Sequence, residues 1–441
     1  MKAWAWLCLF AVLFLAVAGI LPFHDDWTYA TAPNLRFGWR DLLPGGTFWR
    51  PFDSLWGALL AQAPGAFPLA NRALIVAGHV VNVALVGRIL GCRLGAVFFA
   101  GSSAIAATLV NTDTINQVWS FALGAAAVVC ARRPSEGASG WRTVLVAGLL
   151  MASLLAKESG MSWIAALPLL VWWQTRSVRR ATGWLAVGVA VALVYFGLRF
   201  GLQGEVALGD GRDYALGVTP GGLAANLAIG AALPVSGLDA LAWVVGKRAV
   251  FGASAVLSLA FWLAVAGTAV RRSGRAAVAE AGVGAILVTA LALPHCLMTA
   301  HHPAEIHFYP VVFGGAFLVG LAGRAGLSRR GKVVLAGLMA ALFAVGWADK
   351  LGEAHRRSAE TRRRFREIAA RGFDYSKPVY FVVDEDASRV GYSVFRQSVA
   401  HGLDYGLACR ALNGWRDIDR RWMTPANEAE IPSGAQKVRL R

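Results

Sequence analysis

The chain has 441 residues, of which 56% are hydrophobic and only 16% are charged, a charged fraction well below that of a typical soluble protein. Its formal net charge is +17, but the basic residues stand in short clusters between apolar runs. Such clusters are typical of membrane-orientation signals and argue against a nucleic-acid partner. We therefore expect an all-α polytopic membrane protein. The five cysteines, which lack the spacing of a zinc site or a disulfide framework, are Cys8, Cys92, Cys130, Cys296 and Cys409.

Eleven apolar runs approach the roughly 20 residues that a helix needs to cross a bilayer. The first run could instead be a signal peptide, because it follows Lys2 and ends in small residues. Its length and the spans after it favour an uncleaved helix. The predicted spans are 3–21, 68–90, 94–110, 117–131, 142–156, 159–174, 181–199, 249–270, 277–297, 309–323 and 332–348.

Short basic loops give these spans an orientation. With the N-terminus in the cytoplasm, each short inner loop is basic, as the positive-inside rule requires. We therefore expect a multi-pass protein of the bacterial inner membrane, with a membrane domain over 1–348 and an extramembrane tail over 349–441 on the periplasmic side. The basic residues of the inner loops are Arg88, Arg93, Arg132, Arg133, Arg142, Arg176, Arg179, Arg180, Arg271, Arg272, Arg275, Arg324, Arg329, Arg330 and Lys332.

Two long outer segments contain further apolar stretches. In the segment 22–67, the run "RPFDSLWGALLAQ" could form an interfacial helix. In the segment 200–248, the stretch 222–245 could be re-entrant or a missed span.

The tail begins with a basic stretch that predicts a helix ending at Gly372. The run "KPVYFVVDED" predicts a strand and 388–401 a helix, which together suggest a small α/β appendage. The positive-inside rule would prefer this basic helix in the cytoplasm. Either one crossing is miscounted, with 222–245 as the candidate, or the earlier helices fix the orientation, and we favour the second reading. The arginines concerned are Arg356, Arg357, Arg362, Arg363, Arg364, Arg366 and Arg371.

The first motif with chemistry is the acidic pair Asp25 and Asp26, where the first helix leaves the membrane. Two adjacent carboxylates repel each other, and one of them could take a proton from a hydroxyl nucleophile. The pair could also bind a divalent cation, or simply end the helix in water.

Two further motifs carry cations on the outer face. In "FWRP", Arg50 suits a phosphate and Trp49 offers a flat face to a sugar or a lipid headgroup, although an interfacial anchor is equally consistent. In "LLAKESG", Lys157 is a candidate phosphate ligand and Glu158 a candidate site residue with a structural role. Neighbouring residues on a helix do not face each other, so we expect each to meet a partner elsewhere.

The late motif "HCLMTAHHPAEIHFYP" contains His301, His302, His307 and Tyr309 as candidate donors to a phosphate or a sugar. Interfacial polar residues are the plain alternative. A zinc site is conceivable, but the motif HExxH is absent and Pro303 interrupts any regular helix face. We therefore expect no certain cofactor and leave a divalent metal ion as a possibility. In the second span, Asn71, His79 and Asn82 are expected to form hydrogen bonds across helices.

In this order the motifs resemble the GT-C superfamily of polytopic glycosyltransferases, and within it the protein O-mannosyltransferase-like branch. The resemblance covers about residues 1–320. It rests on the acidic pair, "RP", "GHVVNVALV", "VNTDTINQVWSFALG", "AKESG" and "HFYP". It implies an enzyme that uses a polyprenyl-phosphate-linked sugar as donor and modifies a hydroxyl of a glycan, lipid or protein acceptor on the outer face.

The resemblance also implies roles for residues. Asp25 or Asp26 would be the base of an inverting transfer, and Arg50, Lys157 and the stretch from His301 to Tyr309 would surround the departing lipid phosphate. The chain departs from the family where "EIHFYP" replaces a motif rich in arginine and tyrosine. It also departs in "VNTDTINQ", where Asp113 and Gln117 stand at positions that are often Pro and Glu in relatives.

Two other functions remain open from the sequence. A transporter or flippase for a lipid-linked sugar would carry ionisable groups near the membrane midplane and show internal repeats. An envelope scaffold would use its tail to bind a partner and would tolerate loss of the acidic pair.

Overall fold

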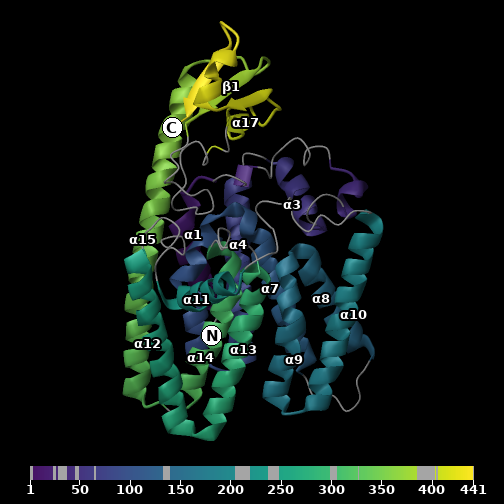
Figure 1. The fold of residues 1–441 in the computed structure, drawn as a ribbon, viewed down its shortest axis with the longest axis vertical. Helices are drawn as coiled ribbons and strands as arrows, with labels where there is room; N and C mark the ends of the chain where they lie inside the picture. Colours follow the sequence, from purple (N-terminus) through teal and green to yellow (C-terminus); the bar gives the residue numbers. More distant parts are fainter. Residues whose placement is uncertain are drawn as a thin grey trace.

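The computed structural model describes residues 3–22, 26–27, 37–44, 49–63, 66–132, 140–203, 219–236, 248–297, 305–325, 327–384, 403 and 406–440. Helices run along the long axis of the molecule, and a small sheet lies at one end of it (Figure 1). The α-helices are α1 (Ala3–Ala18), α3 (Pro51–Ala61), α4 (Phe67–Leu90), α5 (Arg93–Gly101), α6 (Ala106–Val110), α7 (Ile115–Ala131), α8 (Gly140–Ala156), α9 (Ser162–Thr175), α10 (Val178–Gln203), α11 (Pro220–Ser236), α12 (Arg248–Ser273), α13 (Arg275–Cys296), α14 (Val311–Arg324), α15 (Arg329–Ala370) and α17 (Cys409–Leu412). The 3₁₀ turns are η2 (Trp39–Leu42), η4 (Ser103–Ile105), η5 (Thr112–Thr114), η6 (Glu158–Met161), η8 (Glu305–Phe308) and η10 (Pro425–Glu430), and the strands are β1 (Val379–Val383), β2 (Arg420–Met423) and β3 (Gln436–Leu440).

Every predicted span coincides with helical structure. Within the described residues, 5 helices are long and apolar enough to cross a membrane, or 6 if the bent pair formed by 93–101 and 103–110 is one span. Several other apolar helices are shorter, including α1, α8 and α14. The chain is therefore a multi-pass membrane protein, and its exact number of crossings stays a prediction.

The bend in the third predicted span has a local cause. The axes of α5 and of the segment Ser103–Val110 differ by 43°. At the bend, the Ser102 hydroxyl accepts a hydrogen bond from the backbone N–H of Ala104 and donates one to the carbonyl of Pro234 in α11, at 2.8 Å. The bend turns the chain toward η5, which becomes part of the candidate site.

An aromatic cluster fills the centre of the bundle between α4, α5, α7, α9 and α14. The ring of Phe121 lies 5.1 Å from that of Trp163 and 5.5 Å from that of Tyr309, which also packs on Phe99. Close approach here requires a glycine, because a Cβ atom on Gly124 would lie only 2.1 Å from the Trp163 ring.

The buried polar residues of α4 form hydrogen bonds across the bundle, which confirms the sequence prediction. The Asn82 amide nitrogen and His79 Nδ1 each lie 2.9 Å from the Tyr309 hydroxyl. One turn from the start of α4, the Asn71 amide donates to the backbone carbonyl of Thr112 in η5. These bonds satisfy polar groups that would otherwise be costly to bury.

The described part of the stretch 222–245 is the helix α11, which ends at Ser236. The α9–α10 and α12–α13 turns lie at the end of the bundle opposite the sheet, and α11 lies across the bundle (Figure 1). Because α10 leaves that end and α12 returns to it, α11 does not reverse the direction of the chain. The basic part of α15 thus lies at the other end from those two basic turns, and the orientation of the chain in the membrane stays a prediction.

The last predicted span and the predicted basic helix are one continuous helix, α15, of 42 residues. The predicted domain boundary at residue 349 therefore falls inside a helix. Beyond α15, the sheet has the order β2-β1-β3, and β1 pairs in parallel with both neighbours. The sequence predicted β1 but missed β2 and β3, and the helix predicted near 388–401 lies outside the described residues.

A buried ion pair joins α15 to the late motif. Lys350 Nζ lies 2.9 Å from Glu305 Oε1, and the two side chains are only 1% and 3% exposed. Lys350 also donates to the carbonyl of Ser103, at 3.1 Å. The pair thus ties η8, η4 and α15 together.

Because a buried charge without its partner is strongly unfavourable, Lys350→Met should lower the free energy of unfolding by about 3–5 kcal/mol. Denaturant titration of the purified protein in detergent measures this loss. The matched control is Lys377→Met, which removes an ion pair between Lys377 and Asp374. These two side chains are 72% and 48% exposed, respectively. This control should show no measurable loss, and equal losses in both variants would contradict the buried pair's importance.

Candidate functional site

The candidate site is centred on the Asp26 carboxylate, which is fully buried. Its Oδ1 atom accepts hydrogen bonds from the backbone N–H groups of Thr112, at 2.7 Å, and Asp113, at 3.0 Å. Both donors belong to η5, the turn that begins the α7 span. The N-terminal end of a helix stabilises negative charge, so this position suits an ionised carboxylate. The other member of the acidic pair, Asp25, lies outside the described residues.

The sequence analysis missed a cation beside this carboxylate. Arg72 in α4 is fully buried, and its charge interacts favourably with that of Asp26. Its Nη2 atom donates to the carbonyl of Val110 at 3.3 Å, while Nε and Nη1 find no hydrogen-bond partner within the described part of the chain. The signal in the sequence was an arginine inside an apolar span, next to Asn71.

Arg50 begins the helix α3, and the proline after it occupies the first helical position, where its missing N–H costs nothing. Its guanidinium forms an ion pair with Glu158, with two nitrogen atoms each 2.8 Å from Oε2. This pair confirms that Glu158 meets its partner elsewhere in the sequence. Beside Arg50, the Trp49 ring stacks on Tyr195 with centroids 5.2 Å apart, and its indole N–H donates to the Leu42 carbonyl.

Lys157 lies at the turn between α8 and η6, with an extended backbone and a side chain that is only 6% exposed. Its ammonium group makes no hydrogen bond or ion pair with any other described residue. Burial, together with the positive charge of Arg50, lowers the pKa of Lys157 to about 8, although the nearby carboxylates of Asp113, Glu158 and Asp53 oppose this shift. A cation in this state can still gain a negatively charged partner.

These residues form one continuous group. Asp26 is bonded to Asp113, whose charge acts on Lys157, and Arg50 acts on Lys157 in turn. Segments far apart in the sequence therefore bring the carboxylates of Asp26 and Glu158 into the same region as the cations of Arg50 and Lys157. We call Asp26, Arg50, Lys157 and Glu158 the outer cluster.

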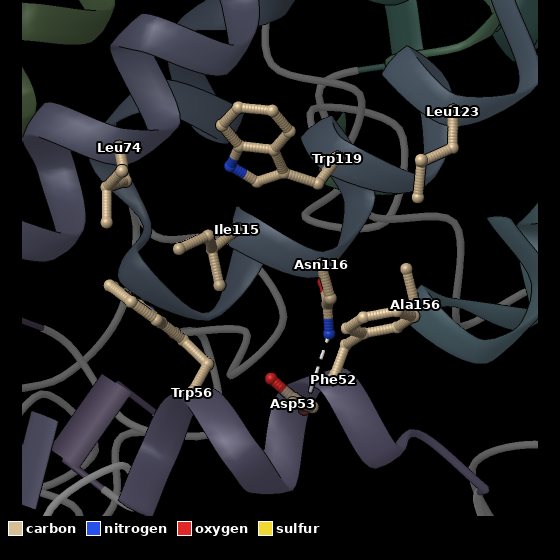
Figure 2. A pocket seen from close by; sticks show the side chains of 9 residues that line it. All are labelled: Phe52, Asp53, Trp56, Leu74, Ile115, Asn116, Trp119, Leu123 and Ala156. Carbon is tan, nitrogen blue, oxygen red and sulfur yellow. Dashed lines mark hydrogen bonds between the residues drawn. The ribbon is translucent and has the colours of Figure 1, made fainter. Parts of the chain in front are cut away.

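An apolar cavity of about 350 Å³ is lined in part by residues that neighbour Arg50 and Lys157 in the sequence. Figure 2 shows its polar edge, where the Asn116 amide donates to Asp53 Oδ2 at 3.4 Å. The rest of the lining is apolar. Phe52 and Asp53 lie in the first turn of α3, just after Arg50, and Ala156 precedes Lys157, so the lining includes close sequence neighbours of both cations. Its lining residues are Phe52, Asp53, Trp56, Leu74, Ile115, Asn116, Trp119, Leu123 and Ala156.

The late motif occupies a different place. Tyr309 is buried in the aromatic cluster of the bundle, and its hydroxyl contacts α4 rather than the outer cluster. His307 stacks on His295 of α13, with ring centroids 4.8 Å apart. The turn η8 packs on α6, which leads into η5. His301 and His302 lie outside the described residues.

A metal site remains without structural support in the described residues, where no three His, Cys, Asp or Glu side chains are grouped closely enough to hold a metal ion. Because His301 and His302 are not among these residues, the zinc hypothesis for the late motif stays a prediction.

Comparison with known proteins gave one informative likeness. Neither a family model nor a curated protein matches the chain. Among solved structures, it is similar to the crystal structure of ArnT from Cupriavidus metallidurans bound to undecaprenyl phosphate, with a TM-score of 0.51 and 14% sequence identity over 95% of this chain and 90% of the ArnT chain. This chain has an ArnT-like fold.

The ArnT-like fold agrees with the GT-C architecture that the order of motifs implied, and it extends that likeness through the tail, beyond residue 320. At 14% identity the match carries the fold alone, so the roles of the outer cluster must be argued from its own geometry.

The geometry of the outer cluster predicts the direction in which the pKa of Lys157 changes when Arg50 is replaced. Replacing Arg50 by Met removes a cation that depresses the pKa of Lys157 and leaves the Glu158 carboxylate without this partner, and both changes should raise that pKa. Titration of ¹³C-methylated lysine by NMR would measure the shift. Arg180→Met, at the other end of the bundle, is the control and should leave the pKa of Lys157 unchanged. A lower pKa in Arg50→Met would contradict the arrangement.

Proposed function

We propose that this chain is a GT-C-type membrane glycosyltransferase that moves a sugar from a polyprenyl-phosphate donor to an acceptor hydroxyl. The transfer takes place at the end of the bundle that carries the tail, which we assign to the periplasmic face of the bacterial inner membrane, with the N-terminus in the cytoplasm. The acceptor is a glycan, a lipid or a protein, and its class stays open.

One observation carries this proposal: a buried carboxylate, held by a helix N-terminus, is linked through Asp113 to two cations, and an apolar cavity is lined by residues that neighbour those cations in the sequence. A lipid phosphate has a matching division into a charged head and an apolar chain. The ArnT-like fold supports the same assignment, because ArnT was crystallised with undecaprenyl phosphate. A transporter is less well supported, because its charges would be expected near the midplane.

In the proposed reaction, Asp26 takes the proton of the acceptor hydroxyl. The oxygen attacks the anomeric carbon of the sugar, and the bond between that carbon and the phosphate oxygen breaks with inversion. The bonding electron pair leaves with the polyprenyl phosphate. Hydrogen bonds from η5 hold the carboxylate in place before the substrate binds. Orienting the base therefore contributes less to the activation free energy. Asp25 stays the alternative base.

Arg50 and Lys157 would stabilise the departing phosphate. Arg50 presents a planar guanidinium that remains charged, and Glu158 fixes its orientation. Lys157 adds an ammonium that has no direct partner in the described residues. Fixed cations in a site with little water stabilise developing negative charge more strongly than water does. The first part of the isoprenoid chain would then occupy the adjoining cavity.

The late motif would act indirectly in this scheme. His307 and Tyr309 pack beside α13 and inside the bundle, and they support η5 through α6. We therefore assign direct contact with the donor to Arg50 and Lys157, and leave His301 and His302 as candidates for sugar contact.

The test of the base is Asp26→Asn, which keeps the size of the side chain but removes its basicity. Sugar transfer, followed as release of polyprenyl phosphate from a labelled donor in membranes, should fall at least about 100-fold. Undecaprenyl-phosphate binding should change little, whereas thermal stability should fall because the buried Arg72 loses a charged neighbour, so turnover is compared at a temperature at which both proteins are folded. Asp41→Asn, a carboxamide at an exposed position in the same outer segment, is the matched control. Turnover near the unmodified level in Asp26→Asn would rule out this base.

Lys157 predicts a pH dependence of donor binding. A group with a pKa of about 8 is mostly charged at pH 7 and mostly neutral at pH 9. If the phosphate binds only the charged form, affinity for undecaprenyl phosphate should fall about 10-fold between these pH values. Arg in place of Lys157 remains charged, so Lys157→Arg should flatten the profile. If the unmodified protein bound undecaprenyl phosphate equally well at both pH values, Lys157 would not be a ligand of the phosphate.

A further inference from the structure

The residue after the proposed base belongs to the core of the tail. Trp27 is only 4% exposed, and it packs in one hydrophobic cluster with residues of the sheet, including Val379 and Phe381. The acidic motif and the C-terminal unit, more than 300 residues apart in sequence, therefore share a core. A shift of the tail must move Trp27, and Asp26 is directly bonded to it.

An aromatic clamp holds Trp27. Its ring stacks on Phe365 of α15, with centroids 6.0 Å apart and planes 15° apart. On the tail side, the Trp415 ring lies 6.1 Å from Trp27 and 5.8 Å, edge-on, from Phe67 at the start of α4. Trp415 thus contacts both the acidic segment and the helix that carries Arg72.

Polar contacts hold the preceding residues against the same helix. Along α15, the Ser358 hydroxyl accepts a hydrogen bond from the backbone N–H of Leu21 at 2.9 Å, and Arg362 donates to the carbonyl of Gly19. The exit of α1 is therefore fixed to α15 on the approach to Asp26, and the clamp fixes the residue that follows.

The backbone of Trp415 supports a specific role for this side chain. It has a φ of 65°, one of two positive values among the non-glycine residues of the described chain. A bulky residue rarely adopts this conformation, because its side chain crowds the backbone there. Its N–H donates to the Arg410 carbonyl at 2.6 Å, which holds the turn after α17 in place. The turn keeps this strained conformation while it directs the indole toward Trp27 and Phe67.

We propose that Trp415 is a positioning residue for Asp26, and that the tail is thereby an integral part of the reaction centre. By clamping Trp27, Trp415 keeps the Asp26 carboxylate on the two N–H groups of η5. This inference rests on the proposed function for its catalytic consequence, but the positioning itself is a property of the fold. With this role for Trp415, the tail is not a separable module that only binds a partner.

Amide hydrogen exchange tests the positioning without any assay of activity. The N–H groups of Thr112 and Asp113 are protected by Asp26, so loss of the clamp should expose them. In Trp415→Ala, exchange of these two amides in lipid nanodiscs should accelerate at least about 10-fold. Asp26→Ala should give the same acceleration. Trp422→Ala removes a tryptophan of the same tail that is 58% exposed, and it should leave both amides protected.

Kinetics then separate positioning from general loss of structure. Trp415→Ala should lower kcat at least about 10-fold with little change in KM for the lipid donor, because the outer-cluster cations are held by other elements. Trp415→Phe should restore both kcat and amide protection, because an aromatic ring remains in the clamp. Thermal unfolding must show that Trp415→Ala retains the folded bundle; if it does not, Trp415→Phe and Trp415→Leu replace it, and only Phe should protect the amides.

The outcomes distinguish this inference from the proposed function. Unchanged protection of Thr112 and Asp113 in folded Trp415→Ala would overturn the positioning role, whatever the activity. Accelerated exchange in Trp415→Ala, in a protein whose unmodified form transfers no sugar, would uphold the clamp and reject the glycosyltransferase. A rise in KM for the lipid donor with kcat unchanged would also overturn the positioning role.

Discussion

A carboxylate removed from water needs donors or cations around it, and the arrangement at Asp26 follows from that requirement. Two backbone N–H groups of η5 bind Oδ1, and the charge of Arg72 lies nearby. To present those N–H groups, the chain must bend after α5 and begin α7 with a free N-terminal turn. The bend is held by the Ser102 hydroxyl, and η5 is held by Asn71. The architecture of several helices thus converges on the stabilisation of one buried negative charge.

The two cations of the outer cluster differ in how their charge is compensated. Arg50 is neutralised by Glu158, which makes it a fixed and oriented part of the site. Lys157 has no such partner within the described residues, and burial depresses its pKa, so its charge would gain further stabilisation from an arriving anion. In the proposed reaction, Arg50 would be the fixed ligand of the phosphate and Lys157 the one that responds to its charge.

Much of this could be predicted from the sequence, because membrane helices leave clear signals. Long apolar runs fixed the positions of the helices, and the spacing of Asn71, His79 and Asn82 indicated their cross-helix bonds. Glu158 was correctly expected to meet a partner elsewhere in the sequence, whereas Lys157 has no direct partner among the described residues. Other features could not be predicted. Arg72 is concealed within an apolar span, β2 and β3 are short and charged, and the contact between Trp27 and Trp415 depends on tertiary packing that no local pattern records.

Because α15 is one continuous helix, the positions of its contacts relative to one another are fixed by their spacing in the sequence. Between Lys350, which is tied to Glu305, and Phe365, which stacks on Trp27, the chain makes about four helical turns. One inserted residue would rotate everything beyond it by about 100° and raise it by about 1.5 Å. Phe365 would then point away from Trp27 even though every side chain of the clamp was retained. In this helix, evolution can exchange residues far more freely than it can add or delete them.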